Sequence, residues 1–177
     1  MASPSDLPIA QPGGTSRWVI MGVSGCGKST IGTALADTFS VPFLEGDAFH
    51  PESNVAKMSA GIPLDDQDRA GWLQALAGEI RRAREQGTGL VLSCSALKRR
   101  YRDLLRDADP ALRFVHLSGP RELIEQRMRQ RVDHYMPPSL LDSQFGILEP
   151  LQADEAGLVL DITQPPSTLV ERITGTS

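Results

Sequence analysis

The sequence predicts a three-layer α/β domain in which helices cover both faces of a five-stranded parallel sheet. Short apolar runs of strand length recur along the chain, and amphipathic patterns of helical period separate them. A glycine-rich segment follows the first run directly. A chain of 177 residues buries roughly 70% of the surface that its unfolded form exposes, which is enough for one core. We therefore expect residues 17–177 to form a single domain.

The expected strands and helices alternate along the chain. Apolar runs predict strands at residues 18–21, 41–44, 90–92, 114–117 and 158–162. Helical patterns lie between them: one through Ile31 and Phe39, one begun by Pro51 and stopped by Gly61, one from Asp66 to the arginines before Gly87, and two at residues 98–106 and 120–131. An apolar segment at residues 140–151 precedes the last strand. In such a fold, ligands bind beyond the carboxyl ends of the strands.

The composition excludes several classes of protein. Hydrophobic residues make up 40% of the chain and charged residues 23%, close to the averages of globular proteins. The net charge is −4, from 18 Lys and Arg against 22 Asp and Glu, whereas dedicated nucleic-acid binders carry a basic excess. No apolar run approaches the length of a membrane span. We therefore expect neither a nucleic acid nor a membrane as a partner.

The cysteines and the N-terminal segment bear on location. Cys26 and Cys94 are the only cysteines, too few for a disulfide framework or a four-ligand zinc site. Residues 1–16 lack the basic and apolar regions of a secretory signal and are rich in Pro, Gly and Ser, so we expect a disordered tail there. Both observations favour a reducing compartment, and the prediction is a cytoplasmic protein.

The glycine-rich segment matches the phosphate-binding pattern G-x-x-x-x-G-K-[ST] between an expected strand and an expected helix. In this pattern backbone N–H groups turn toward the phosphates of a nucleoside triphosphate, and the helix adds its positive N-terminal end. Lys28 is expected to reach the β- and γ-phosphate oxygens and Ser29 to ligate magnesium. The expected nucleotide-binding residues of this loop are Gly22, Val23, Ser24, Gly25, Cys26, Gly27, Lys28, Ser29 and Thr30.

Other motifs argue against a GTP switch. GTPases that read guanine carry an Asn-Lys-x-Asp motif, but Asn54 is the only asparagine and Val55 follows it. The residues from Asp68 to Gly71 match Asp-x-x-Gly but fall inside an expected helix.

Phosphoryl transfer to an acceptor hydroxyl needs a carboxylate that receives the proton. Asp47 follows the second expected strand on the ligand-binding side, so we expect it to be that catalytic base.

Several basic residues are candidates for contacts with anionic groups. Lys57 and Arg69 lie in segments that should overhang the acceptor site. Arg127 and Arg131 are four residues apart on one face of an expected helix and lead into a proline-containing stretch. Such a pair is typical of a mobile lid that closes on the triphosphate and stabilises the charge of the transition state. We place this lid at about residues 131–145.

The chain resembles the small gluconokinases, a family of P-loop kinases related to the shikimate and nucleoside monophosphate kinases. The resemblance extends over residues 18–173. The strings that carry it are MGVSGCGKST, EGDAFHPESNVAKMSAGIPLDDQDRAGWL, CSALKRRYRDLLR and HYMPPSLLDSQFGILEP. It implies a three-layer P-loop kinase fold with a mobile lid, and ATP-dependent, magnesium-assisted phosphorylation of the 6-hydroxyl of D-gluconate to 6-phospho-D-gluconate. It also implies a homodimer.

The resemblance assigns further candidate residues. Gln164 and Pro165, after the fifth expected strand, would form the loop beside the adenine. Gluconate has a carboxylate at the end opposite to the reacting hydroxyl, so a cation must lie some distance from Asp47. The candidates, in order of preference, are Arg69, Lys57 and Lys98, and His50 is a candidate contact for a sugar hydroxyl.

Two alternative functions stay open on the sequence. The first is a P-loop kinase for another small acceptor, such as shikimate or a nucleoside monophosphate. Ser93, Cys94 and Ser95 stand where shikimate kinases typically carry a glycine triplet, which counts against shikimate. The second is a non-catalytic ATP-binding regulatory protein, against which the presence of both Lys28 and Asp47 argues.

Overall fold

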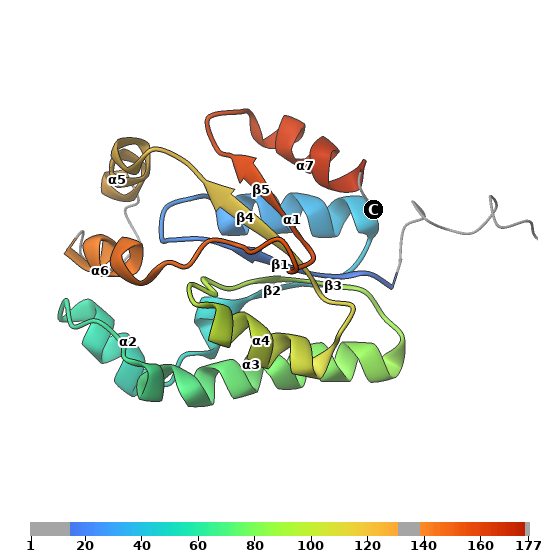
Figure 1. Cartoon of the computed structure of the whole chain (residues 1–177), viewed down its shortest axis with the longest axis horizontal. Helices are drawn as coiled ribbons and strands as arrows, with labels where there is room; N and C mark the ends of the chain where they lie inside the picture. Colours follow the sequence, from blue (N-terminus) through green and yellow to red (C-terminus); the bar gives the residue numbers. More distant parts are fainter. Residues whose placement is uncertain (1–14, 131–138, 176–177) are drawn as a thin grey trace, which may run out of the picture.

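The computed structural model describes residues 15–130 and 139–175, and its centre is a five-stranded parallel sheet (Figure 1). The strands are β1 (Arg17–Met21), β2 (Phe43–Glu45), β3 (Leu90–Ser93), β4 (Arg113–Ser118) and β5 (Gly157–Asp161). Their order in the sheet is β2-β3-β1-β4-β5, and all neighbouring pairs are parallel. The predicted strands are confirmed, with ends that differ by at most two residues.

The helices fill the connections between the strands. They are α1 (Lys28–Phe39), the short 3-10 helix η2 (Gly46–Phe49), α2 (Glu52–Ser59), α3 (Asp66–Gln86), α4 (Arg99–Ala108), α5 (Arg121–Arg129), α6 (Ser139–Ile147) and α7 (Pro166–Thr174). Among the described residues, no helix combines the length and the apolar character needed to cross a membrane. The Asp-x-x-Gly match lies inside α3, as predicted.

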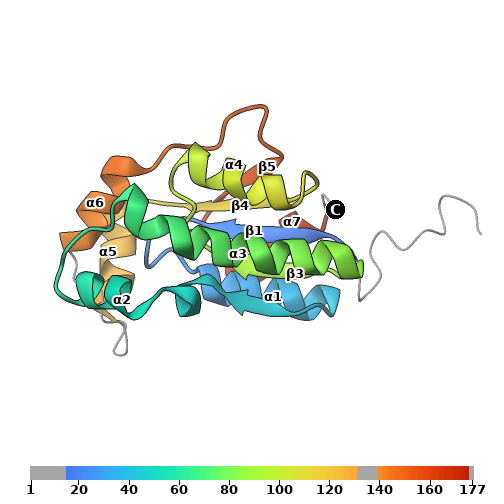
Figure 2. The same cartoon turned by 90° about the horizontal axis from the view of Figure 1, so that it is seen from below.

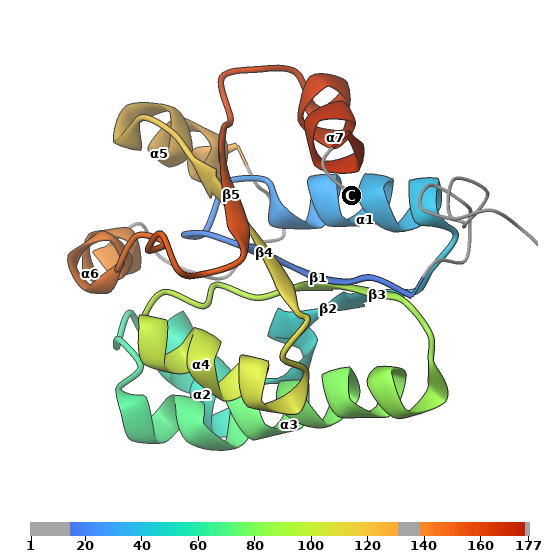
Figure 3. The same ribbon diagram turned by 45° about the vertical axis from the view of Figure 1, so that its right-hand side comes forward.

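Alternate side chains of a strand point to opposite faces of the sheet, and β1 therefore contributes to two cores. Trp18 and Ile20 pack in a cluster with buried residues of α1 and α7, whereas Val19 and Met21 pack with those of α3 and α4. Figure 3 shows α1 and α7 on one side of the sheet and α3 and α4 on the other. The predicted three-layer α/β architecture is thus confirmed.

Three shorter helices, α2, α5 and α6, gather at the end of the molecule to which the strands point (Figures 1 and 2). The loops after the strands open at this end, which is where ligands bind in open parallel sheets. The architecture therefore places the phosphate-binding loop, the segment after β2 and the segment after β3 side by side.

Besides the 3-10 helix η2, two α-helices lie where sequence reasoning assigned none. The apolar segment at residues 140–151 contains α6, and the chain after β5 forms α7, which has a proline in its first turn. Proline suits this position because its missing N–H would have no intrahelical partner there. Residues 1–14 of the expected tail and residues 131–138 of the expected lid lie outside the described residues, and the single-domain organisation stays a prediction.

Gly46 joins β2 to its neighbours at the end of the sheet. A Cβ atom on Gly46 would lie 2.0 Å from the carbonyl oxygen of Ser93, so only glycine allows this approach of β2 to β3. The Gly46 N–H donates to Ser93 Oγ at 3.1 Å, and Trp72 Nε1 donates to the Gly46 carbonyl at 2.8 Å. Gly46 is therefore bonded to both β3 and α3, and this fixes the start of the segment that follows β2.

A buried ion pair attaches the segment before β5 to α4. Both side chains of the Arg102–Glu155 pair are fully buried, with Nε–Oε1 at 2.7 Å and Nη2–Oε2 at 3.0 Å. Arg102 Nη1 also donates to the Ala96 carbonyl at 2.8 Å. Burial raises the pKa of Glu155, but hydrogen bonds from Arg102, the Gln152 N–H and Arg106 outweigh it and lower the pKa to about 2. The pair holds the loop before β5 against the segment after β3.

Substitution of Gly46 by alanine should destabilise the fold. The added Cβ meets a backbone oxygen inside the sheet, which cannot move aside cheaply, so we expect a loss of roughly 1–3 kcal/mol or more. Gly71→Ala is the matched control, because nothing lies within 4 Å of its Cβ position in α3. Alanine at this helical position should raise the free energy of unfolding by about 0.5–1 kcal/mol. Urea denaturation measures both, and equal stability of the two variants would contradict the role of Gly46.

His116 should make the stability depend on pH. It is 5% exposed in β4, and burial, with a smaller effect of Arg102 and Lys28, lowers its pKa from 6.5 to about 4. Between these values the unfolded chain binds a proton that the folded chain does not, so the free energy of unfolding should fall by up to about 3 kcal/mol as the pH drops from 6.5 to 4. Urea denaturation of the wild type and of His116→Leu should show a shallower pH dependence in the variant; identical slopes would exclude His116 as the cause.

Candidate active site

The phosphate-binding loop connects β1 to α1 and turns inward at the end of the sheet. Gly27 adopts a left-handed conformation with φ 98°, immediately before the first residue of α1. Lys28 Nζ donates to the carbonyls of Gly22 and Val23 at 2.9 and 3.0 Å, so the ammonium lies over the loop. The N-terminal end of α1, with its unpaired N–H groups, points into the same space. A helix end and a cation together favour an anion at this place.

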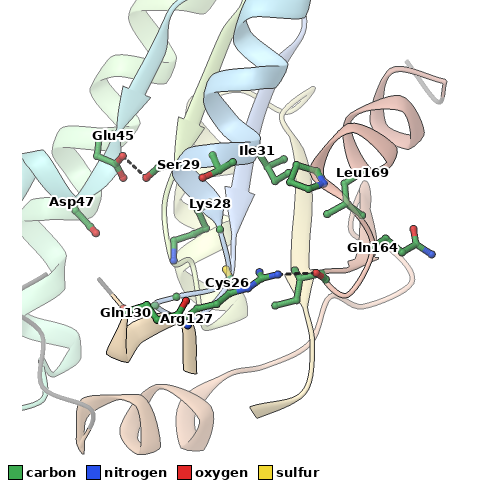
Figure 4. A pocket seen from close by; sticks show the side chains of 16 residues that line it. Cys26, Lys28, Ser29, Ile31, Glu45, Asp47, Arg127, Gln130, Gln164 and Leu169 are labelled. Carbon is green, nitrogen blue, oxygen red and sulfur yellow. Dashed lines mark hydrogen bonds between the residues drawn. The ribbon is translucent and has the colours of Figure 1, made fainter. Parts of the chain in front are cut away.

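A cavity of about 430 Å³ extends from this loop across the end of the sheet (Figure 4). Glu45 and Asp47 lie on one side of it, Gln164 and Leu169 on the opposite side, and Lys28 between them. The residues that line it are Ser24, Gly25, Cys26, Gly27, Lys28, Ser29, Thr30, Ile31, Glu45, Asp47, Arg127, Gln130, Ile162, Gln164, Pro166 and Leu169. One end is polar and holds the loop, and the other is partly apolar, as the phosphates and the base of a nucleotide require.

Some of the residues expected beside the nucleotide line the cavity and others do not. Seven of the nine loop residues, those from Ser24 to Thr30, line the cavity, and Gly22 and Val23 do not. Gln164 lines it, whereas its neighbour Pro165 does not and Pro166 does instead. The resemblance therefore pointed to the segment after β5, and in the cavity lining the proline stands one residue later in the chain. A strand-to-helix connection gave no signal for which of two adjacent prolines faces inward.

Arg127 lies beside the phosphate-binding loop. Its Nη2 donates to the carbonyl of Ile162 at 3.1 Å, and a Cβ on Gly27 would be 3.9 Å from its Nη1. The guanidinium thus spans from α5 toward the segment after β5 and lines the large cavity. Arg131, its predicted partner, lies outside the described residues.

Cys26, inside the loop, is a buried free thiol that is 1% exposed. Burial raises the pKa of the Cys26 thiol, and the nearby Lys28 only partly offsets this. Burial therefore favours the thiol over the thiolate, which is the reactive form.

A second, smaller cavity of about 30 Å³ adjoins the first and is enclosed by η2, α2, α3 and α6. The residues that line it are Ser24, Lys28, Asp47, His50, Met58, Pro63, Leu64, Arg69, Trp72, Ser95, Leu140, Ser143 and Gln144. Ser24, Lys28 and Asp47 line both cavities. The two cavities therefore meet at Lys28 and Asp47.

Arg69 supplies a buried positive charge to the smaller cavity. The residue is 7% exposed, its Nη1 donates to Tyr101 Oη at 3.2 Å, and its guanidinium lies 5.5 Å from the centre of the Tyr101 ring. Within residues 15–130 and 139–175, Arg69 forms no ion pair with a carboxylate. A buried guanidinium without an anionic partner is costly, so an anionic ligand would stabilise it.

The other two expected cations are placed elsewhere. Lys57 Nζ contacts the two carboxylate oxygens of Asp68 at 2.8 and 3.0 Å, and Lys98 Nζ contacts Asp66 Oδ1 at 3.0 Å. Neither lysine lines either cavity. The structure thus brings Asp47, His50 and Arg69 together around the smaller cavity and leaves Lys57 and Lys98 outside its lining.

Two polar residues that contact the phosphate-binding loop were not selected from the sequence. Glu45, the last residue of β2, accepts hydrogen bonds from Ser29 Oγ at 2.5 Å and Ser93 Oγ at 2.7 Å. Gln144 Oε1 of α6 accepts from the Ser24 N–H at 2.7 Å and thereby joins α6 to the phosphate-binding loop. The position of Glu45 at the carboxyl end of a strand was a usable signal, whereas no sequence pattern indicated Gln144.

Comparison with known proteins identifies the family. Residues 18–147 match a family model described as an AAA domain. The thermosensitive gluconokinase of Escherichia coli is 43% identical over 157 residues, which are 88% of this chain and 83% of that protein. A sugar kinase from Janibacter superposes with a TM-score of 0.87 at 49% identity, over 90% of this chain and 92% of that one. A gluconokinase from Sinorhizobium meliloti superposes with a TM-score of 0.81 at 43% identity, over 91% and 90%.

The match extends over both halves of the site, because it includes the phosphate-binding loop as well as the elements around the smaller cavity. Identity above 40% over more than four-fifths of both chains also exceeds what a shared fold alone requires. The P-loop protein described above is therefore a member of the gluconokinase family.

Proposed function

We propose that the protein is a gluconokinase that transfers the γ-phosphoryl group of ATP to the 6-hydroxyl of D-gluconate, giving 6-phospho-D-gluconate and ADP. The observation that carries this proposal is that the phosphate-side cavity and the smaller cavity share Lys28 and Asp47. A donor and an acceptor can therefore be held against each other. The family supports gluconate as the acceptor, and the buried charge of Arg69 supports an acceptor with an anionic end.

Asp47 is the catalytic base in this mechanism. It is an exposed residue at the start of η2 and lines both cavities, so its carboxylate can receive the proton of a hydroxyl that points toward the loop. In phosphoryl transfer most of the catalysis comes from positioning and from cations around the transferred group. Lys28 and Arg127 supply those charges, together with the N-terminal end of α1. Arg131 is proposed as a second lid arginine on the sequence pattern alone.

The oxygen atoms around Ser29 fit a magnesium ion. Ser29 Oγ and the Glu45 carboxylate are adjacent, and hard oxygen ligands of this kind are those that magnesium prefers. A magnesium ion held here would keep waters and phosphate oxygens as its other ligands. When bound, magnesium neutralises charge on the β- and γ-phosphates. Ser29 would hold it, and Glu45 would orient Ser29.

Arg69 is the best-placed partner for the gluconate carboxylate. It lines the smaller cavity on α3, whereas Lys57 and Lys98 are engaged by Asp68 and Asp66. A planar guanidinium also matches a carboxylate better than an ammonium does. The carboxylate would then bind on the α3 side and the 6-hydroxyl beside Asp47.

We also propose that the enzyme works in the cytoplasm as a homodimer. Two buried free cysteines support a reducing compartment, and the resemblance to the small gluconokinases supports the dimer.

Acceptor-dependent release of ADP tests the function. With magnesium and ATP, we expect D-gluconate to stimulate ADP release strongly and shikimate, AMP and CMP to leave it at the background rate. Stimulation by one of the other acceptors instead would overturn the choice of gluconate. No stimulation by any acceptor, with ATP still bound, would favour the regulatory alternative.

The variant Asp47→Asn tests the proposed catalytic base in the same assay. Loss of the base should lower kcat for gluconate about 10²- to 10⁴-fold while the KM for ATP changes little. Asp107→Asn, at an exposed position on α4, is the matched control and should keep the wild-type rate. A near-normal kcat in Asp47→Asn would exclude the base role.

Arg69→Ala should raise the KM for gluconate about 10- to 100-fold, because a charged hydrogen bond contributes roughly 1.5–3 kcal/mol. The KM for ATP should stay within about twofold, since Arg69 lines only the smaller cavity. Arg69→Lys retains the charge and should have an intermediate effect, and Lys57→Ala is the control outside the cavity. Equal changes in both KM values would contradict a carboxylate contact.

A further inference from the structure

The imidazole of His50 is held on two sides at the wall of the smaller cavity. Its ring stacks on Trp72, with centroids 4.1 Å apart and an interplanar angle of 17°. Trp72 is fixed in turn by the hydrogen bond from its Nε1 to the Gly46 carbonyl. The second constraint comes from Asn54 in α2, whose Nδ2 is 3.2 Å from His50 Nδ1. The plane of the ring and one of its nitrogens are therefore fixed by residues outside the reaction.

The orientation of the Asn54 amide follows from its other contact. Asn54 is 2% exposed, and its Nδ2 donates to the backbone carbonyl of Asp68 at 2.9 Å. A carbonyl oxygen can only accept, so the nitrogen and not the oxygen of the amide must face it. The same nitrogen carries a second hydrogen, and this one is directed at His50 Nδ1.

The protonation of His50 follows in the same way. Nδ1 faces an N–H donor, so it must accept with its lone pair and cannot carry a proton. The neutral ring then carries its proton on Nε2. In the part of the chain that the structure describes, Nε2 has no hydrogen-bond partner.

We propose that Asn54 is a positioning residue that holds His50 as the neutral Nε2–H tautomer, so that His50 presents a hydrogen-bond donor to an oxygen of the acceptor. This inference rests on the proposed function and adds to it a residue that acts through another. The inference gives each of three polar groups around the smaller cavity a hydrogen-bonding role. Asp47 accepts from the reacting hydroxyl, whereas Arg69 and His50 donate to oxygens farther along the substrate. A polyhydroxy carboxylate matches this arrangement of acceptor and donors.

The charges around His50 agree with a neutral ring. Burial lowers the pKa of His50, Asp47 raises it, and Arg69 lowers it, with a net shift below the usual 6.5. Lys28 of α1 lines the same cavity and is a further positive charge. The residues of α6 in the lining are uncharged: Leu140, Ser143 and Gln144. Protonation would also put an Nδ1–H against the Asn54 N–H, so the hydrogen bond and the charges favour the same state.

The test is the protonation of the two ring nitrogens, measured by long-range ¹H–¹⁵N NMR on the full chain labelled with ¹⁵N-histidine. The chain has three histidines, and His50→Gln identifies the signals of His50. In the wild type at pH 7 we expect a protonated Nε2 and an unprotonated Nδ1. Addition of D-gluconate should shift the Nε2–H signal. A protonated Nδ1 in the wild type would overturn the inference without any variant.

Asn54→Asp reverses the contact, because a carboxylate can only accept. We expect the proton to move to Nδ1 or the ring to become cationic, and the KM for gluconate to rise about tenfold with the KM for ATP unchanged. Ser53→Asp is the matched control: it adds the same charge to an exposed neighbouring position of α2 and should leave both the tautomer and the KM as in the wild type. Asn54→Ala, which removes the donor without adding charge, should give a mixture of tautomers.

The outcomes separate the two proposals. Gluconate phosphorylation with an Nε2 signal that gluconate does not shift would overturn the donor role of His50 and leave the proposed function in place. An unchanged tautomer in a folded Asn54 variant would overturn the positioning role. A confirmed Nε2–H tautomer in a protein that phosphorylates only another acceptor would overturn gluconate as the substrate, while the Asn54 contact would stand.

Discussion

The close approach of Gly46 to β3 is the contact on which the site depends. Its N–H binds Ser93 and its carbonyl binds Trp72, so the end of β2 is tied to β3 on one side and to α3 on the other. The residue before it, Glu45, contacts Ser29 of the phosphate-binding loop, and the residue after it is Asp47. One backbone position therefore sets the distance between Asp47 and the phosphate-binding loop. Because any Cβ there would collide with a main-chain oxygen, no other residue type can do this.

The distribution of charge explains how a chain with net charge −4 can bind two anions. Many of the surface cations are neutralised by neighbouring carboxylates, as Lys57 is by Asp68 and Lys98 by Asp66. Two cations that line the cavities are different: within residues 15–130 and 139–175, Lys28 contacts carbonyl oxygens and Arg69 contacts a tyrosine hydroxyl and ring, and neither forms an ion pair with a carboxylate. These cations favour a positive potential at the cavities although the net charge of the chain is negative. The low-dielectric walls of a cavity strengthen the field of cations that lack a counter-charge.

Sequence reasoning reached the strands and the phosphate-binding loop because their signals are local. The pattern around Lys28 and Ser29 depends on spacing within one loop, and Asp47 follows directly from the end of a strand. It did not reach Gln144 or Asn54, whose partners Ser24 and Asp68 are 120 and 14 residues away along the chain. It ranked Arg69 above Lys57 and Lys98, and Arg69 alone of the three lines the smaller cavity, but it offered no reason why both lysines should be paired with carboxylates.

The sequence by itself determined the fold class, the nucleotide loop and the family resemblance, since apolar periodicity and motif spacing are properties of neighbouring residues. Only the tertiary structure decided which polar groups share a cavity and which cations are paired with carboxylates. The assignment of the proton on His50 also depends on it. These depend on side chains that meet across η2, α2, α3 and α6, and a hydrogen bond fixes a proton only when both partners are in place. Burial of Arg102 with Glu155 was likewise decided by the packing of α4 on the loop before β5, because no local pattern distinguishes a buried pair from a solvated one.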